Sequence, residues 1–314
     1  MSNIDKTTAD LLDIVTDVDG KAFDPEKFAG AFNIRSNCTS LGRKSTENIK
    51  IETKTDNPGL DIRIAPGTKG EDVYIPACVT KAGIDDLVYN DFFVGEGADV
   101  TIIAGCGIHT ETGEEARHSG IHRFFCGKNS RVLYLEKHVG TGNSAAKKVI
   151  DPQTEVFLEE GAYLEIDTSQ LGGVCRSDRK TRGTVGKNAT LVIKERLLTD
   201  GDDVATTDFE IEMNGEGGGI NLMSRSVAQG DSYQKYHSSI IGNAMCTGHS
   251  ECDAILSDNG KVDAIPQLIA NCKDASLIHE AAIGKIAGEQ ILKLRTLGLT
   301  EEEAEKAIID GFLK

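Results

Sequence analysis

The sequence contains no tryptophan, only 5% aromatic residues and no long apolar run. A core built from it must come mainly from valine, isoleucine, leucine and alanine. No apolar run approaches the roughly 20 residues that a membrane-spanning helix needs. Residues 1–5 have neither the basic nor the apolar region of a secretory signal. We therefore expect a chain that neither spans a membrane nor follows a secretory route.

Positive charge is also scarce, because 34 lysine and arginine residues face 50 aspartate and glutamate residues, giving a net charge of −16. Such a surface repels phosphate backbones and anionic lipids, which argues against nucleic-acid and membrane-surface partners. Eight cysteines without a secretory signal indicate reduced thiols rather than a disulfide framework. The expected location is therefore the cytoplasm.

Glycine is abundant, with 34 residues, which indicates many tight turns. Four turns of similar form each precede a short apolar run, and their third positions are Gly97, Asn129, Gly161 and Asn188. Glycine and asparagine tolerate a positive φ best, so one left-handed turn is predicted to recur. Its intervals of 32, 32 and 27 residues fit the coils of a β-solenoid. A β-sandwich also combines short strands with glycine turns, and it stays an alternative.

The N-terminal segment, residues 1–44, reads as helical. Its apolar face consists of Leu11, Ile14, Val15 and Val18. Asp24 and Pro25 predict the N-cap and first position of a second, short helix through Phe28. Residues 45–278 show alternating apolar runs and are predicted to form the β core.

The C-terminal segment, residues 279–314, is predicted to be helical again. Its apolar stripe consists of Ile283, Ile286, Ala287, Ile291, Leu294 and Leu297. Gly298 suits the position after the first helix, and Thr300 with Glu303 predicts a capping box for the second. For most of the stripe we expect packing against the β core, because an amphipathic helix ordinarily buries its apolar face.

The sequence has no P-loop and no zinc motif, and its one match to a dinucleotide fingerprint, Gly140–Ala145, lacks the room for a following helix. It has no G-x-x-x-x-G-K-[ST] loop, so ATP, if used, must be bound by a partner. The cysteines form neither a C-x₂-C pair nor a ferredoxin run. His118 and His122 have the i, i+4 spacing of a helix, but Gly120 between them disfavours one. A self-contained metal site is not expected, whereas a site assembled from distant residues or from two chains is compatible with the sequence.

Two local features are candidates for chemistry. Cys252 alternates with Ala254 and Leu256 on the apolar side of a predicted strand. The simplest interpretation of such a cysteine is a small buried side chain. His279 and Glu280 begin the terminal helical segment, where a glutamate ordinarily complements the helix dipole. Taken alone, both features have structural explanations.

Longer stretches of the chain resemble one protein family. The residues that carry the resemblance are Met223–Ala228, Gly248–Asp253, His279–Ile286, Glu289–Gln290, Gly298–Ala304 and Gly311–Leu313, with Gly105–His109 and Leu135–His138 upstream. They resemble the SufB and SufD proteins of iron–sulfur cluster assembly, in particular a short SufB-like branch. The resemblance runs from about residue 30 to the end and is most specific over the final seventy residues.

The resemblance implies a right-handed parallel β-helix with helical segments at its ends. It implies a scaffold rather than an enzyme, which builds and transfers clusters in a SUF-type system. The ATPase SufC is the implied partner, docked on the C-terminal helical segment. By motif position, Cys252 is the cluster- or sulfur-handling cysteine, Glu280 the essential carboxylate and His279 an additional ligand. The implied cargo is a transient cluster, with [4Fe–4S] favoured.

The ligand set predicts a homodimer, because each chain supplies too few motif ligands to close a site. Two copies would contribute Cys252 and Glu280 twice, which leads to a complex of two scaffolds and two ATPases. SufB often has a glutamate where this chain has Ile278, which removes one candidate ligand. Cys175 matches no motif and is no more than a candidate relay thiol. The rival interpretation is a SufD-like subunit that supports assembly without carrying the cluster.

Overall fold

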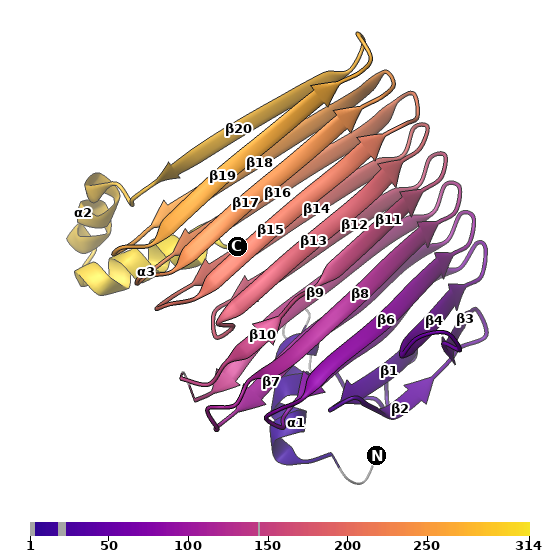
Figure 1. Ribbon diagram of the computed structural model, residues 1–314, viewed down its shortest axis with the longest axis horizontal. Helices are drawn as coiled ribbons and strands as arrows, with labels where there is room; N and C mark the ends of the chain where they lie inside the picture. Colours follow the sequence, from indigo (N-terminus) through magenta and orange to yellow (C-terminus); the bar gives the residue numbers. More distant parts are fainter. Residues whose placement is uncertain (1–3, 18–22, 144) are drawn as a thin grey trace.

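The structure is a computed structural model that describes residues 4–17, 23–143 and 145–314. The chain winds into a β-solenoid of about eight coils, with helices near both ends (Figure 1). Each coil contributes strands to two sheets of ten strands each. The predicted parallel β-helix is therefore confirmed, and the β-sandwich alternative is wrong.

In each sheet the strands follow one another in a fixed spatial order. The first sheet runs β2 (Thr39–Lys44), β1 (Ala31–Ser36), β5 (Lys69–Val79), β7 (Asp99–Thr110), β9 (Arg131–Gly142), β12 (Tyr163–Leu171), β14 (Thr190–Thr199), β16 (Gly218–Ala228), β18 (Cys246–Leu256) and β20 (Ser276–Gly284). The second runs β19 (Lys261–Ala270), β17 (Tyr233–Gly242), β15 (Val204–Met213), β13 (Arg176–Val185), β10 (Lys148–Ile150), β8 (Ala116–Cys126), β6 (Asp85–Val94), β4 (Gly59–Ile64) and β3 (Ile49–Thr53), with β11 (Gln153–Leu158) between β13 and β8.

Strands from successive coils pair in parallel, so residues one coil apart lie side by side. Arg131, for example, pairs with Asp99 of the preceding coil and with Tyr163 of the following one. The exceptions are the hairpins β1–β2 and β3–β4 at the N-terminal end, which are antiparallel. Because the pairing is parallel and in register, a side chain that points inward on one coil stacks on inward side chains of its neighbours.

The predicted left-handed turn is confirmed at all four positions. The φ angles of Gly97, Asn129, Gly161 and Asn188 are 63°, 54°, 69° and 50°. Gly217 repeats the turn one coil further on with a φ of 71°, which the sequence prediction missed. A residue with a branched side chain would be strained at these places, so glycine and asparagine mark this corner in five successive coils.

The core lies between the two sheets and follows the alternation of each strand. Along β8, for example, every second residue is buried. Aliphatic side chains dominate this core, as expected, and the largest fully buried side chains are Tyr134, Phe92, Phe124 and Phe209. Burying a side chain of this size contributes about 1.5–3 kcal/mol, so repeated inward stacking accounts for most of the stabilisation.

The N-terminal helix is shorter than predicted. Helix α1 covers Lys6–Thr16, and the Asp5 carboxylate caps it by accepting a hydrogen bond from the backbone N–H of Thr8 at 2.9 Å. Leu11 and Val15 of its apolar face are buried against β7. Val18, which was assigned to the same face, lies outside the described residues.

The helical interpretation of the remainder of residues 1–44 is wrong. Asp24 begins only a turn, in which its carboxylate accepts from the backbone N–H of Glu26, and no helix follows through Phe28. Strands β1 and β2 come next, so the β structure starts at Ala31 rather than at residue 45. The turn around Pro25 therefore leads into the solenoid.

The C-terminal helices also begin later than predicted, because β20 continues to Gly284. Helix α2 covers Gly288–Thr296 and α3 covers Glu301–Phe312. The capping box of Thr300 and Glu303 is confirmed, and so is the position of Gly298, whose φ is 100°.

Only one of these two helices packs against the solenoid. Ile309 and Leu313 pack against Val227, whereas α2 buries none of its residues. Leu297, at the end of the predicted stripe, is 73% exposed. The expectation that most of the stripe packs on the β core is therefore wrong for α2, which projects at one corner (Figure 1).

Candidate functional site

Cys252 lies on the inner face of β18, in the last coil but one. It pairs with Ser224 of β16 on one side and with Ala281 of β20 on the other, and it is 1% exposed. Burial, with the Glu195 carboxylate as a smaller cause, raises the pKa of its thiol to about 12. The thiol is therefore protonated at neutral pH, and it becomes a nucleophile or an iron ligand only when its surroundings change.

His279 faces the same interior as Cys252. It lies opposite Ser250 on β20, two positions before Ala281, which pairs with the cysteine. Its Nδ1 is buried and has no hydrogen-bond partner among the described residues. Burial is the largest cause that lowers the pKa of this imidazole. A neutral ring with an unused nitrogen is suited to bind a metal ion.

Glu280 lies on the opposite face of the same strand. His279 and Glu280 were predicted to begin a helical segment, but that prediction is wrong. Both belong to β20, where neighbouring side chains point to opposite faces. The Glu280 side chain is 69% exposed, and its Oε2 is 3.6 Å from Nε2 of His249. The structure thus brings Cys252 and His279 to one face and leaves Glu280 outside with His249.

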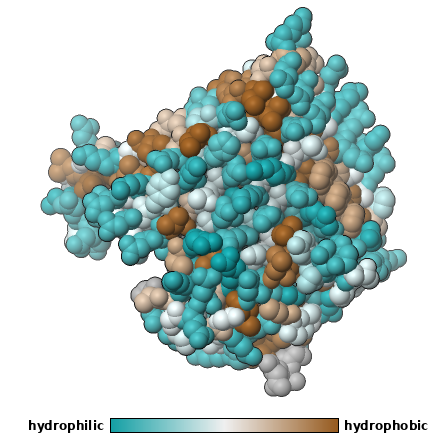
Figure 2. All heavy atoms as spheres, in the orientation of Figure 1, coloured by the Kyte–Doolittle hydropathy of each residue, from teal (hydrophilic) through white to brown (hydrophobic). Residues whose placement is uncertain are grey.

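The end of the solenoid beside these residues is uncovered. Leu268 and Ile283 face inward on the last coil and are 38% and 42% exposed. Their partners one coil earlier, Ile240 and Ala254, are 0% and 4% exposed. Apolar surface appears in brown in Figure 2 along the edge and at the corner that Figure 1 assigns to β20 and α2.

A chain of buried polar side chains runs inside the solenoid toward Cys252. We call it the buried polar chain, and its members are His122, Tyr134, Glu136, Arg179, Glu195 and Ser224. All of them are at most 6% exposed. No motif in the sequence predicts this chain. The only signal in the sequence was the presence of polar residues at inward positions of otherwise apolar strands.

The first contacts of the buried polar chain join His122 to Arg179. His122 Nδ1 is 2.6 Å from the Tyr134 hydroxyl, which donates to Oε1 of Glu136 at 2.8 Å. Arg179 donates to the other oxygen of Glu136 at 3.0 Å. Burial would raise the pKa of Glu136, but the charges of His138 and Arg179 hold it well below its usual range. Glu136 is therefore an ionised carboxylate inside the core.

The remaining contacts lead to the neighbour of Cys252. Arg179 Nε is 3.4 Å from Oε1 of Glu195, and Ser224 donates to Oε2 of Glu195 at 2.8 Å. Ser224 pairs directly with Cys252. One buried cation thus lies between two buried carboxylates, and the second of them approaches the cysteine.

Cys175, the candidate relay thiol, has a different setting. Cys175 is half-buried, and its thiol donates to the carbonyl of Lys148 at 3.1 Å. All eight cysteines of the chain are unpaired. Within the described residues, no group of three or more His, Cys, Asp or Glu side chains is arranged to hold a metal ion. A cluster at Cys252 therefore needs a rearrangement, a second chain or both.

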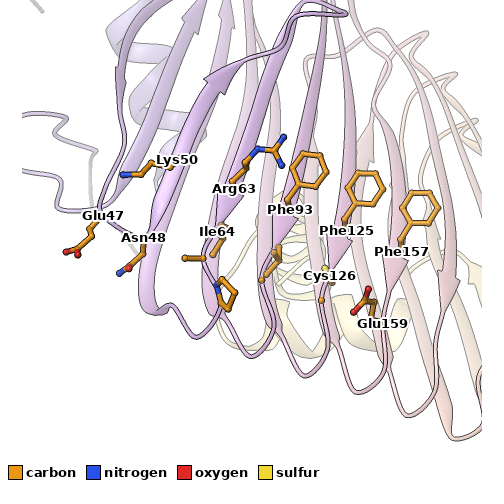
Figure 3. Close-up of a pocket in the computed structure, with 15 residues that line it drawn as sticks. Glu47, Asn48, Lys50, Arg63, Ile64, Phe93, Phe125, Cys126, Phe157 and Glu159 are labelled. Carbon is orange, nitrogen blue, oxygen red and sulfur yellow. The ribbon is translucent and has the colours of Figure 1, made fainter.

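A cavity lies elsewhere, on the outer face of the second sheet. It has a volume of about 620 Å³ and is lined by Phe93, Phe125 and Phe157 (Figure 3). Their rings stack at 5.1 and 5.0 Å, with the Arg63 guanidinium 4.3 Å from the Phe93 ring. Such pairs contribute about 0.5–1.5 kcal/mol each. Stacking between coils accounts for this row, which contains none of the candidate site residues.

Comparison with known proteins gives the family. Residues 90–312 match the family model described as the SufBD core domain of SUF-system iron–sulfur cluster assembly. A protein of Archaeoglobus fulgidus named as an iron–sulfur cluster assembly SufBD family protein is 31% identical over 278 residues, which are 87% of this chain and 73% of that protein. A protein of the same name from Methanothermobacter thermautotrophicus is 29% identical over 273 residues.

The aligned part is smaller for the second relative, of which this chain spans 64%. A third SufBD family protein, from Methanocaldococcus jannaschii, is 26% identical over 75% of this chain. No helix within the described residues is long and apolar enough to cross a membrane. The coil turns, the parallel solenoid and these matches agree, and the chain belongs to the SufBD family of iron–sulfur cluster assembly proteins.

Proposed function

We propose that this protein is a cytoplasmic scaffold on which iron–sulfur clusters are built and from which they are transferred. The observation that carries the proposal is the shared inner face of Cys252 and His279 beside an uncovered end of the solenoid. One thiolate and one imidazole give iron a mixed and labile ligation, which suits cargo that has to leave again. The eight unpaired cysteines are consistent with a reducing compartment. The expected cargo is a transient [4Fe–4S] cluster.

Cluster binding at Cys252 requires the last coil to open. The thiol has to lose its proton and become accessible, and both are opposed by burial under β20. Strand β20 is an edge strand of its sheet and, among the strands of the described residues, pairs only with β18, so it is easily displaced. We expect ATP binding by a partner to supply the driving force, and this chain itself to hydrolyse no ATP.

Glu280 is proposed to bind iron from the outer face. In the present register it cannot share a site with Cys252 of the same chain, because its side chain points away from the interior. A shift of β20 by one residue would exchange the faces of His279 and Glu280. Displacement of β20 would therefore bring the carboxylate to the thiol as well as expose the thiol.

A second copy of the chain is the proposed cover for the open end. The inward-facing Leu268 and Ile283 are exposed there. Strands β19 and β20 each have one edge without a partner strand in the part of the chain that the structure describes. Exposed edges and apolar ends are normally protected by another chain. A two-fold dimer would also place two copies of Cys252 and Glu280 near one axis. Light scattering should show two copies, and a strictly monomeric complex that carries a cluster would contradict this arrangement.

A SufC-like ATPase is proposed to dock on residues 283–314. The support is the unburied helix α2, on which Leu292 and Leu297 are 62% and 73% exposed. Replacing both leucines with serine should abolish co-purification with the ATPase without unfolding the solenoid. Leu171→Ser is the matched control, because Leu171 is also exposed, at 51%, but lies on β12. Retained capture by the double variant would refute the docking assignment.

Anaerobic reconstitution with iron and sulfide tests the scaffold role. The complex of this chain with its ATPase should develop the absorption and Mössbauer spectra of a cluster. His279→Gln should lower the yield because it removes the imidazole beside Cys252. Glu280→Gln should weaken cluster formation because it keeps the shape but removes the charge.

The alternative is a SufD-like subunit that supports assembly without carrying the cluster. The observations that favour it are the separation of Glu280 from Cys252 and the absence, within the described residues, of a three-ligand group. If the wild-type complex forms no cluster while its ATPase is active, the scaffold proposal fails and this alternative takes its place.

A further inference from the structure

A pair of histidines lies far from Cys252, near the N-terminal end of the solenoid. His118 and His122 are on β8, and with Gly120 between them they occupy alternate, inward-facing positions. The two histidines are 2% and 6% exposed. Residues four apart share a face in a strand as they do in a helix, so the two histidine side chains point the same way.

Hydrogen bonds assign the same tautomer to both rings. His118 Nδ1 is 3.2 Å from Oδ2 of Asp86, a carboxylate that can only accept, so Nδ1 carries the proton. The Tyr134 hydroxyl donates its proton to Glu136 and is left to accept from Nδ1 of His122 at 2.6 Å. In its neutral form, each ring therefore presents the lone pair of Nε2. A histidine whose other nitrogen donates to such a partner is the usual form of a metal ligand.

The two Nε2 atoms converge on the space that Gly120 leaves empty. A Cβ atom on Gly120 would lie 3.1 Å from Nε2 of His122 and 3.6 Å from Nε2 of His118. No hydrogen bond to Nε2 of His118 exists within the described residues, and Nε2 of His122 has a long contact of 3.3 Å with the Asn90 amide. The glycine thus leaves room for an atom between the Nε2 atoms of the two rings.

The space opens into a cavity of about 270 Å³. His118, His122, Asn90 and Cys106 all line this cavity. Asn90 is 5% exposed, and its Oδ1 is buried with no partner within the described residues. Rotation of the amide would release the Nδ2 contact and turn this oxygen toward the imidazoles. An unsatisfied buried acceptor beside two imidazole lone pairs calls for a cation or a proton donor.

We propose that His118 and His122 bind a divalent first-row transition-metal ion over Gly120, with Asn90 Oδ1 as a third ligand and the remaining positions open to the cavity. Imidazole suits such ions. Metal–nitrogen bonds of about 2.0–2.1 Å require both Nε2 atoms to close on the ion over Gly120, because a Cβ atom there would lie 3.1 and 3.6 Å from them. An open, partly protein-ligated site holds an ion for transfer rather than permanently. Its identification as a binding site for ferrous iron before cluster assembly rests on the proposed function.

The test uses the full chain carrying Cys252→Ser, so that the proposed cluster site cannot bind the probe. Co²⁺ is titrated anaerobically and followed by its d–d absorption and by equilibrium dialysis. In this background, Gly120→Ala places a methyl group between the two Nε2 atoms. Gly183→Ala is the matched control, because its inward Cβ is crowded to the same 3.1 Å, but by Ile211 instead of histidine.

We expect one Co²⁺ per chain, an affinity about tenfold or more weaker in Gly120→Ala, and no change in Gly183→Ala. Tyr134→Phe should also weaken binding by about 10–100-fold, because it removes the partner that fixes the His122 ring. Equal binding by Gly120→Ala and Gly183→Ala, or no binding at all, would overturn the proposal. Neither result bears on the proposal that clusters are assembled at Cys252. Likewise, a failure to reconstitute the cluster would not bear on the Co²⁺ site.

A second measurement needs no variant at the site. Long-range ¹H–¹⁵N spectra of the histidine rings, recorded with and without Zn²⁺, identify which nitrogens bind. The expected result is a shift of Nε2 in His118 and His122 with both Nδ1 atoms still protonated. Shifts confined to the partly exposed His109, His237 or His249 would mean adventitious surface binding and would refute the site.

Discussion

Replacing Arg179 with methionine tests whether the buried polar chain is an essential part of the fold. Arg179 is 6% exposed and is the cation between Glu136 and Glu195, at 3.0 and 3.4 Å. Both carboxylates are at most 5% exposed. Methionine has a similar length and keeps most of the apolar contacts. The change therefore takes the arginine cation from two buried carboxylates, of which Glu136 keeps His138 as a neighbour.

The expected loss is about 3–5 kcal/mol of unfolding free energy, because breaking a buried ion pair leaves an uncompensated charge. That is a large part of the roughly 5–15 kcal/mol that holds a typical domain together. Chemical denaturation followed by circular dichroism, with calorimetry to verify a single transition, measures the loss. The combined variant Arg179→Met, Glu136→Gln and Glu195→Gln should recover most of it, because no buried charge is then left unpaired.

Arg196→Met is the matched control. Arg196 pairs with Asp167 on the outer face of the same solenoid, where the two side chains are 23% and 20% exposed. Solvent screens such a pair, so its loss should amount to about 1 kcal/mol or less. If Arg179→Met is as mild as Arg196→Met, the buried charges are not held by Arg179, and the reasoning about the buried polar chain is wrong.

Three further outcomes follow from local features. The pKa of Glu136 in the folded protein is depressed below its unfolded value of about 4.5. The ionised carboxylate therefore stabilises the fold above that pH, and this contribution is lost as the pH falls below it. Glu136→Gln should flatten the acid denaturation curve in that range. Iodoacetamide at mildly alkaline pH should modify the exposed Cys38 of the native protein and leave Cys252, with its pKa of about 12, unmodified, as mass spectrometry of peptides would show. Thr300→Ala should lower the protection of α3 amides in hydrogen exchange by about 1 kcal/mol, because it removes the capping box with Glu303.

The solenoid could be predicted from the sequence because its corner turns depend on local chemistry. Gly97 and Asn129 adopt a positive φ for reasons confined to those residues and their neighbours. The turn can therefore be recognised as a repeated pattern in the sequence. The parallel register of the coils depends on the spacing of this pattern, so the turn and the fold could be predicted together.

The two ends were misread because apolar spacing there fits both a helix and a strand. Phe32 and Ile34 are two residues apart and belong to β1, within a segment assigned to helices. Ile283 lies on β20, while Ile286 follows the strand and Ile291 lies on α2. The predicted stripe therefore joined residues from two different elements. Only pairing with a neighbouring coil decides where such a strand stops.

The candidate site could be predicted as a set of residues but not as a geometry. Cys252 was assigned to the apolar side of a strand, and it is buried there. His279 and Glu280 were predicted to lie in a helical turn, in which adjacent side chains do not point to opposite faces. In β20 they point to opposite faces. The buried polar chain was missed for a related reason, since only the register shows that Glu136 and Arg179 point inward toward each other.

The most direct test of the scaffold role is the ⁵⁷Fe Mössbauer spectrum of anaerobically reconstituted complex carrying either Cys252→Ser or Cys246→Ser. Both cysteines lie on the inner face of β18, at 1% and 3% exposure, so the two changes disturb the fold to a similar extent. The account predicts a cluster signal in Cys246→Ser and none in well-folded Cys252→Ser. A normal cluster in Cys252→Ser would contradict the central claim that this thiol holds the cargo.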